Sequence, residues 1–168
     1  MSEHTVLADG AILRRAEPRD LPEILERIRD LAEYEREPDA VETTTDDLDA
    51  ALFGPHPAVY AHVVETDGRI EGIAVWFLNF STWTGKHGIY LEDLYVDPAA
   101  RGRGYGVALL RELARTCEAN GYQRLDWSVL KWNEPSIAFY DSLGAFPMDE
   151  WVGYRLTGTA LKDLSGLL

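Results

Sequence analysis

Apolar residues follow helical spacing in some stretches of the chain and gather in β-rich runs in others. In the first helical stretch they recur about every 3.6 residues, at Leu21, Ile24, Leu25, Ile28 and Leu31. The pattern predicts helices over residues 17–37, 43–53, 104–120 and 133–143. Residues 43–47 can cap the second of these helices, and Gly121 is a C-cap glycine after the third. Strands are predicted over residues 11–16, 58–65, 69–80, 88–96, 122–130 and 146–156, with a turn at Thr66-Asp67-Gly68 between the second and the third.

This order of elements predicts one α/β domain in which a mixed sheet carries helices on its faces. No internal repeat or low-complexity tract interrupts the 168 residues, a length that suits a single domain. We place the domain at residues 11–157, with residues 1–10 and 158–168 as N-terminal and C-terminal tails.

The composition narrows the class of protein. Hydrophobic residues make up 46% and charged residues 27% of the chain, as in soluble globular proteins, and no stretch approaches the roughly 18 consecutive apolar residues of a membrane span. The first residues lack the features of a signal peptide, so we expect a cytoplasmic protein.

Cys117 is the single cysteine, which excludes a disulfide framework. His56, His62 and His87 have no second ligand at metal spacing, so we expect surface or turn histidines and no metal.

Charge is distributed unevenly along the chain. The formal net charge is −13, and residues 17–49 contain 13 acidic residues against four arginines. An acidic protein is a poor ligand for nucleic acid, so we expect no nucleic-acid partner. Residues 98–111 instead contain three arginines and no acid, which would suit a polyanion.

A glycine-rich loop follows the predicted strand 88–96. The loop runs from Asp97-Pro98 through Arg101-Gly102-Arg103-Gly104-Tyr105-Gly106 and leads directly into the predicted helix 104–120. A strand, a glycine-rich turn and a helix in this order bring backbone N–H groups and a helix N-terminus together, an arrangement that binds phosphate.

Other interpretations of the loop remain open on these residues alone. A Walker A loop needs Lys and then Ser or Thr after its last glycine, where Val107 and Ala108 stand. A dinucleotide fingerprint needs its third glycine where Val107 lies, although Asp126 has the place of a ribose-binding acid. The loop can also be an ordinary turn with solvated arginines.

A second motif lies in the predicted helix 133–143. Asn133 can cap this helix, and Asn133, Ser136 and Tyr140 are spaced so that they share one face. A polar stripe suits a ligand channel, while the alternative is a structural tyrosine with a satisfied hydroxyl group.

These motifs together resemble a known family. The pattern Arg101-x-x-Gly104-x-Gly106 is similar to the pyrophosphate-binding loop of the Gcn5-related N-acetyltransferases (GNAT). Residues 31–35, 90–96 and 133–145 resemble the spermidine/spermine N-acetyltransferase branch, which includes diamine and thialysine acetyltransferases. The resemblance implies a mostly antiparallel sheet with splayed central strands, acetyl-CoA as co-substrate and a homodimer.

The resemblance also implies residue roles. Transfer of acetyl to an amine needs a general base, because an alkylamine with a pKa of about 10 is mostly charged at neutral pH. Glu92 matches the family's base, and Tyr140 matches its acid, which protonates the leaving thiolate. The residues implied to bind the coenzyme are Leu94, Tyr95, Val96, Arg101, Gly102, Arg103, Gly104, Tyr105, Gly106, Val107, Asn133, Ser136 and Tyr140.

The implied acceptor is a small cationic amine, such as a polyamine, a diamine or a thialysine-like amino acid. The residues implied to bind it are acidic, aromatic or polar: Tyr34, Glu35, Trp83, Glu92, Asp93, Asp126 and Ser128. Val152 and Tyr154 depart from the branch, which has an acid and a tryptophan there, so an acceptor with fewer charges is expected. Acetylation of an amine-bearing antibiotic or a protein amine, or a non-catalytic acyl-CoA-binding module, remain alternatives.

Overall fold

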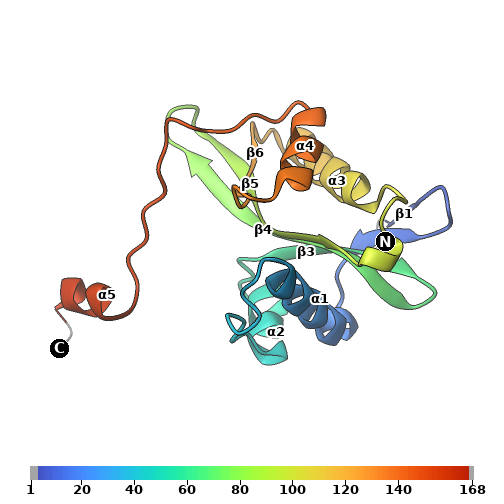
Figure 1. Ribbon diagram of the computed structural model, residues 1–168, viewed down its shortest axis with the longest axis horizontal. Coiled ribbons are helices and arrows are strands. Elements are labelled where there is room, and N and C mark those ends of the chain that lie inside the picture. Colours follow the sequence, from blue (N-terminus) through green and yellow to red (C-terminus); the bar gives the residue numbers. More distant parts are fainter. Residues whose placement is uncertain (1–3, 167–168) are drawn as a thin grey trace. The chain divides into compact units, whose positions relative to one another are not determined.

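A six-stranded sheet is the framework of the protein in the computed structural model, which describes residues 4–166 (Figure 1). Its strands follow the sequence order from one edge to the other, antiparallel except for the last pair, which is parallel. The strands are β1 (His4–Val6), β2 (Ile12–Arg15), β3 (Tyr60–Thr66), β4 (Arg69–Ser81), β5 (Lys86–Val96) and β6 (Leu125–Trp127). This arrangement confirms the predicted mixed, mostly antiparallel sheet.

Helices cover both faces of the sheet (Figure 1). The first face carries α1 (Leu21–Tyr34), which follows a 3₁₀ turn η1 (Pro18–Asp20), and α2 (Thr45–Phe53). The opposite face carries α3 (Tyr105–Asn120), which follows a second 3₁₀ turn, η2 (Pro98–Ala100). The main apolar core lies between α1, α2 and the sheet and includes Ile24, Val63 and Ile73, all fully buried.

Local sequence signals explain several element ends. The side chain of Thr44 accepts a hydrogen bond from the Asp47 N–H group, and the Asp47 carboxylate accepts one from the Thr44 N–H group, which is the predicted cap of α2. The β3–β4 hairpin turns at Asp67 and Gly68, both with positive φ, as a two-residue turn of the primed type requires. Gly121 ends α3 in the left-handed conformation, as predicted.

Two irregularities shape the middle of the sheet. Between β4 and β5, Trp76 pairs with Leu91 and Val75 with Asp93, so Glu92 is the extra residue of a β-bulge. Between β5 and β6, pairing covers only Ile89 to Leu91, and β5 then continues to Val96 without β6 beside it. This separation confirms the splayed strands that the family resemblance implies.

The chain divides into two units at the junction of Ser128 and Val129. The second unit contains α4 (Glu134–Ser142) and α5 (Gly158–Ser165). The predicted strand over residues 146–156 is wrong: the structure has no strand there, and Tyr154 in it is 97% exposed. A β-rich segment forms a strand only when a neighbouring strand accepts its hydrogen bonds, and none pairs with this segment among the described residues.

Within the segments predicted as tails, residues 4–6 form β1, which pairs with β2, and residues 158–165 form α5. Two smaller predictions need correction. The predicted strand 122–130 shortens to Leu125–Trp127. His62 is buried rather than at the surface or in a turn, accepts a hydrogen bond from Trp76 Nε1 at 3.1 Å, and has its pKa lowered to about 4, chiefly by burial.

Candidate functional site

The glycine-rich loop has the conformation that an anion site needs. Gly102 and Gly104 have φ angles of +82° and +80°, and no heavy atom lies within 4 Å of the position that a Cβ atom would take on either. Gly104 is the N-cap of α3, and no side chain caps the helix. The first N–H groups of α3 therefore have no side-chain cap, as at a helix N-terminus that receives a phosphate.

The two loop arginines differ in their partners. Arg103 lies 3.8 Å from a Glu71 carboxylate oxygen. Arg101 donates from Nε to the backbone carbonyl of Val96 at 3.1 Å. Its guanidinium group also lies over the rings of Tyr34 and Tyr95, 5.6 Å and 5.7 Å from their centroids. Arg101 thus joins the predicted coenzyme loop to α1.

The side chain of Tyr105 has a structural role. It is 1% exposed, and its hydroxyl group donates to an Asp9 carboxylate oxygen at 2.7 Å and lies 3.3 Å from Thr66 Oγ1. Tyr105 can therefore offer a bound coenzyme only its backbone N–H group. Gly106 and Val107 follow it in the first turn of α3, and Leu94 lies two residues before Val96 on β5.

A cluster of carboxylates lies on β5 before the loop, next to the end of α1. Glu92 is exposed in the bulge, and Asp93 is partly buried. The pKa of Asp93 is raised to about 6, first by burial and then by the negative charges of Glu92 and Glu35. Burial also raises the pKa of Glu35. Negative charge is concentrated here, and a cation that entered would reduce this repulsion.

Four other residues predicted to bind the acceptor have surroundings that the structure defines. Trp83 is 89% exposed in the β4–β5 turn, and Tyr34 stands at the end of α1. Asp126 Oδ2 accepts from Asn79 Nδ2 and from Arg124 Nε, each at 3.0 Å, so its charge already has a cationic partner. Ser128 Oγ is 2.9 Å from the Tyr90 hydroxyl group.

In the second unit, Asn133 is 7% exposed and its side chain accepts a hydrogen bond from the Ser136 N–H group at 3.4 Å. It caps α4, as predicted, and Tyr140 follows on that helix with its ring 5.4 Å from that of Phe139. The roles of Asn133, Ser136 and Tyr140 toward the coenzyme stay predictions.

The sequence interpretation missed the buried arginine Arg27. It lies in α1 and makes an ion pair with Asp97, the residue that follows β5. One signal was present: Arg27 stands between Ile24 and Leu31 on the apolar stripe of α1, where a charge is out of place unless it has a partner.

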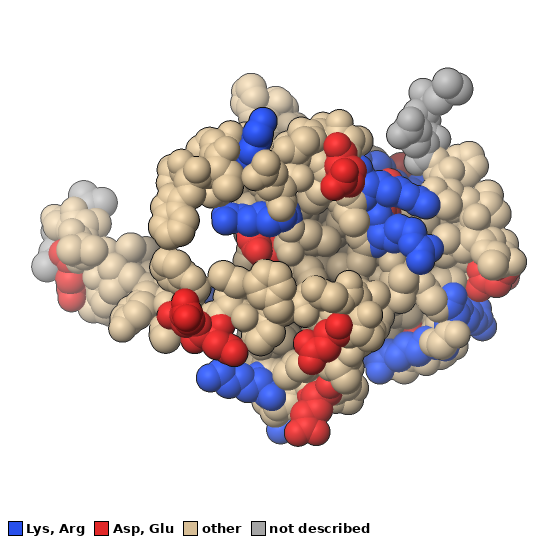
Figure 2. All heavy atoms as spheres, turned by 90° about the horizontal axis from the view of Figure 1, so that it is seen from above, with Lys and Arg blue, Asp and Glu red and all other residues tan. Residues whose placement is uncertain are grey.

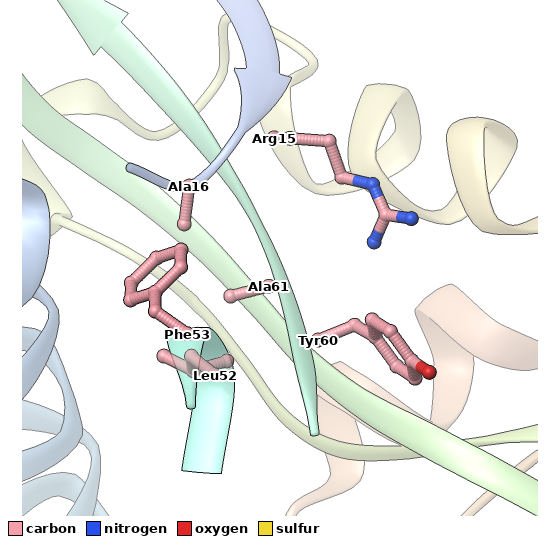
Figure 3. Close-up of a pocket in the computed structure, with 6 residues that line it drawn as sticks. All are labelled: Arg15, Ala16, Leu52, Phe53, Tyr60 and Ala61. Carbon is pink, nitrogen blue, oxygen red and sulfur yellow. The ribbon is translucent and has the colours of Figure 1, made fainter. Parts of the chain in front are cut away.

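A surface pocket of about 170 Å³ lies elsewhere, at the ends of β2, β3 and α2. Its lining residues are Arg15, Ala16, Leu52, Phe53, Tyr60 and Ala61, and Figure 3 shows Arg15 and Tyr60 extended side by side, away from Leu52 and Phe53. None of these residues belongs to the predicted site.

Residues 4–166 carry charged side chains of both signs on their surface. Figure 2 shows basic side chains in a small group and otherwise interspersed with acidic ones, not as a continuous basic stripe on the face in view. No cluster of three or more His, Cys, Asp or Glu that could hold a metal ion occurs in this part of the chain. Within it, no helix is both long and apolar enough to cross a membrane.

Comparison with known proteins identifies the family. Residues 21–145 match the model of the acetyltransferase (GNAT) family, and the chain belongs to this family. Acetyltransferases of this family take acetyl-CoA as co-substrate. The match confirms the resemblance seen in the loop and in α4.

Individual relatives and solved structures are similar to this chain over most of its length. The chain is 34% identical to thialysine N-epsilon-acetyltransferase of Sus scrofa, in an alignment that covers 94% of this chain and 98% of that protein. Among solved structures, an integron cassette protein from the mobile metagenome of V. cholerae is 26% identical with a TM-score of 0.78, covering 92% of this chain and 97% of that one. An aminoglycoside acetyltransferase from an uncultured soil metagenomic sample shares the fold, with a TM-score of 0.76 over 90% of this chain and 99% of that one at 18% identity.

Proposed function

We propose that this protein transfers the acetyl group of acetyl-CoA to the primary amine of a small cationic molecule, with both substrates bound at once. One observation carries the proposal. A single strand, β5, leads at one end into an uncapped glycine-rich loop suited to pyrophosphate and holds Glu92 and Asp93 a few residues before it. The two substrates then meet along β5.

Glu92 is the proposed base. The bulge removes it from the regular pairing of β4 with β5 and leaves its carboxylate exposed. A charged ammonium group cannot attack a thioester, so a carboxylate must take its proton, directly or through a water molecule. Tyr140 is the proposed acid that returns a proton to the thiolate of coenzyme A.

The proposed coenzyme site uses mainly backbone groups. Leu94, Tyr95 and Val96 lie where β5 has no neighbour in β6, so their backbone can accompany an extended ligand arm. The N–H groups from Gly102 to Val107 then face the pyrophosphate, while Asn133 and Ser136 contact the coenzyme further along. This assignment needs no metal.

The proposed acceptor is a polyamine, a diamine or a thialysine-like amino acid. Glu35, Glu92 and Asp93 supply negative charge, and Tyr34 and Trp83 supply aromatic faces, a combination that favours cations. The similarity to thialysine N-epsilon-acetyltransferase of Sus scrofa supports the amino acid in particular. Asp126 is a weaker part of this proposal because Arg124 already pairs with it.

We also propose that the protein works as a cytoplasmic homodimer. This part rests on resemblance to the spermidine/spermine branch and on the sequence features described above. Sedimentation of the purified protein would test the assembly: a monomer at micromolar concentration would contradict it.

A thiol-release assay with a panel of amines tests the activity. The panel contains thialysine, lysine, spermidine, a short diamine, an aminoglycoside and a lysine-containing peptide, each with acetyl-CoA. We expect turnover with at least one small amine, and a fall in kcat of about 100-fold or more in Glu92→Gln and Tyr140→Phe. Glu118→Gln, an exposed change on α3, is the matched control and should keep the wild-type rate.

Two results would contradict the proposal. If the protein binds acetyl-CoA but acetylates no amine in the panel, it is a non-catalytic acyl-CoA-binding module. If only the aminoglycoside or the peptide is acetylated, the substrate class is wrong although the reaction is right.

A further inference from the structure

Side chains of α1 reach the proposed coenzyme loop at two places. The first is Arg27, which is 3% exposed and donates from Nη1 to Asp97 Oδ2 at 2.7 Å. Arg69, at the start of β4, donates to the same oxygen at 3.2 Å, and the Ala99 N–H group donates to Asp97 Oδ1 at 2.9 Å. Asp97 directly follows β5 and begins the loop. The start of the loop is therefore tied to α1 by a largely buried ion pair.

The second place is Tyr34, the last residue of α1. Its ring and that of Tyr95 lie under the guanidinium group of Arg101, whose Nε also donates to Val96. Arg101 makes no salt bridge to any residue that the structure describes, whereas Arg103 pairs with Glu71. The rings fix the position of Arg101 and leave its charge uncompensated by a carboxylate. Such a cation can pair with a phosphate oxygen.

We propose that Tyr34 and Arg27 are positioning residues for the coenzyme: they hold the loop and Arg101 in the conformation that binds the pyrophosphate. This inference rests on the proposed function, because it takes the loop to be the coenzyme site. A loop that is ordered before binding loses less conformational entropy when the ligand arrives. The sequence interpretation gave Tyr34 a role toward the amine only, so an effect of Tyr34 on the coenzyme is a new expectation.

Calorimetric titration of CoA in the absence of any amine tests the inference directly. Tyr34→Leu removes the aromatic face and should weaken CoA binding about two- to fivefold, the size of one partly exposed cation–π contact. Tyr34→Phe keeps the ring and should bind CoA like the wild type. Arg27→Met removes a charge-assisted hydrogen bond and should weaken CoA binding about tenfold.

A double-mutant cycle separates positioning from a general structural effect. If Tyr34 acts through Arg101, Tyr34→Leu should cause no further loss of CoA affinity in an Arg101→Met background. Additive losses would show that Tyr34 acts independently of Arg101 and would overturn the inference. Tyr34 lies partly at the surface, so its variants test the proposal even if Arg27→Met fails to fold.

The outcomes distinguish this inference from the proposed function. A wild-type protein that binds no CoA would overturn both. A wild-type protein that binds CoA, with Tyr34→Leu binding it equally well and raising only the KM for the amine, would overturn the positioning role alone. Loss of CoA affinity in Tyr34→Leu with recovery in Tyr34→Phe is the supporting result.

Discussion

Asp93 and Asp97 stand four residues apart, one within β5 and one just after it, yet their surroundings have opposite effects on their charge. The pKa of Asp97 lies below its usual value, because the Ala99 N–H group donates to the carboxylate and Arg27 and Arg69 lie beside it. The pKa of Asp93 rises to about 6, because it is partly buried next to Glu92 and Glu35. The Asp97 carboxylate, next to the proposed coenzyme loop, is paired with cations, whereas the Asp93 carboxylate, next to the proposed amine site, lies beside other carboxylates.

The difference indicates what each region binds. Around Asp97, protein groups satisfy the carboxylate, and the remaining charge is the positive one on Arg101. Around Asp93, carboxylates repel one another, and the missing partner is a cation. A protein that keeps such repulsion lowers its own stability, and the usual reason is a ligand that relieves it. Four changes test this contrast, from the largest expected effect to the smallest.

Tyr105→Ala tests how strongly packing at the start of α3 stabilises the coenzyme side. Removing a fully buried aromatic side chain leaves a cavity at the start of α3, so the free energy of unfolding should fall by about 3–5 kcal/mol. Denaturation in urea measures this. Tyr105→Phe keeps the ring and loses the bond to Asp9, so it should lose only about 1 kcal/mol. Equal losses in the two variants would mean that the hydroxyl group, not packing, holds the helix start.

Asp93→Asn sharpens the contrast through pH. The folded protein binds the Asp93 proton more tightly than the unfolded chain does, since the folded pKa is about 6 against an ordinary 3.8. Ionised Asp93 therefore lowers stability increasingly as pH rises from about 4 to 6. Asp93→Asn should be about 1–3 kcal/mol more stable than the wild type at pH 7 and nearly equal to it at pH 4.

Asp97→Asn is the control of opposite sign for that measurement. Its carboxylate has a lowered pKa, so its contribution to stability is present above the ordinary pKa and is lost as pH falls through the folded pKa. Asp97→Asn should be less stable than the wild type at pH 7. If both asparagine variants change stability in the same direction at pH 7, the contrast between the two regions is wrong.

Trp83→Ala should have the smallest effect on stability. The side chain is almost fully exposed, so the free energy of unfolding should change by less than about 0.5 kcal/mol. If Trp83 contacts the amine, its loss should raise the KM of the amine about two- to fivefold and leave the affinity for CoA unchanged. An unchanged KM would remove Trp83 from the proposed acceptor site.

The sequence predicted those features that depend on a few neighbouring residues. The capping pair Thr44 and Asp47, the Asp67-Gly68 turn and the loop glycine Gly104 act through their own backbone or that of near neighbours, and each lies where predicted. The sheet and its mostly antiparallel order followed from the periodicity and the family resemblance.

Features that depend on distant residues were not predictable in the same way. The strand expected over residues 146–156 needs a neighbouring strand, and β-propensity alone does not supply one. The ion pair of Arg27 with Asp97 joins residues 70 positions apart, and the partner of Asp126 is known only once β4 and β6 are placed. The family resemblance implied that Asp126 binds the acceptor, and although Arg124 is only two residues away, the sequence does not show that the two side chains pair.

The bulge at Glu92 has a consequence for how the protein can change over evolution. Because Trp76 pairs with Leu91 and Val75 with Asp93, the ladder of β4 and β5 is complete without Glu92. The residue that we assign to proton transfer is thus a surplus position, inserted into a sheet that folds around it. Substitution there, or even its deletion, would alter chemistry while leaving the architecture in place, so new reactivity could arise at this position at little risk to folding.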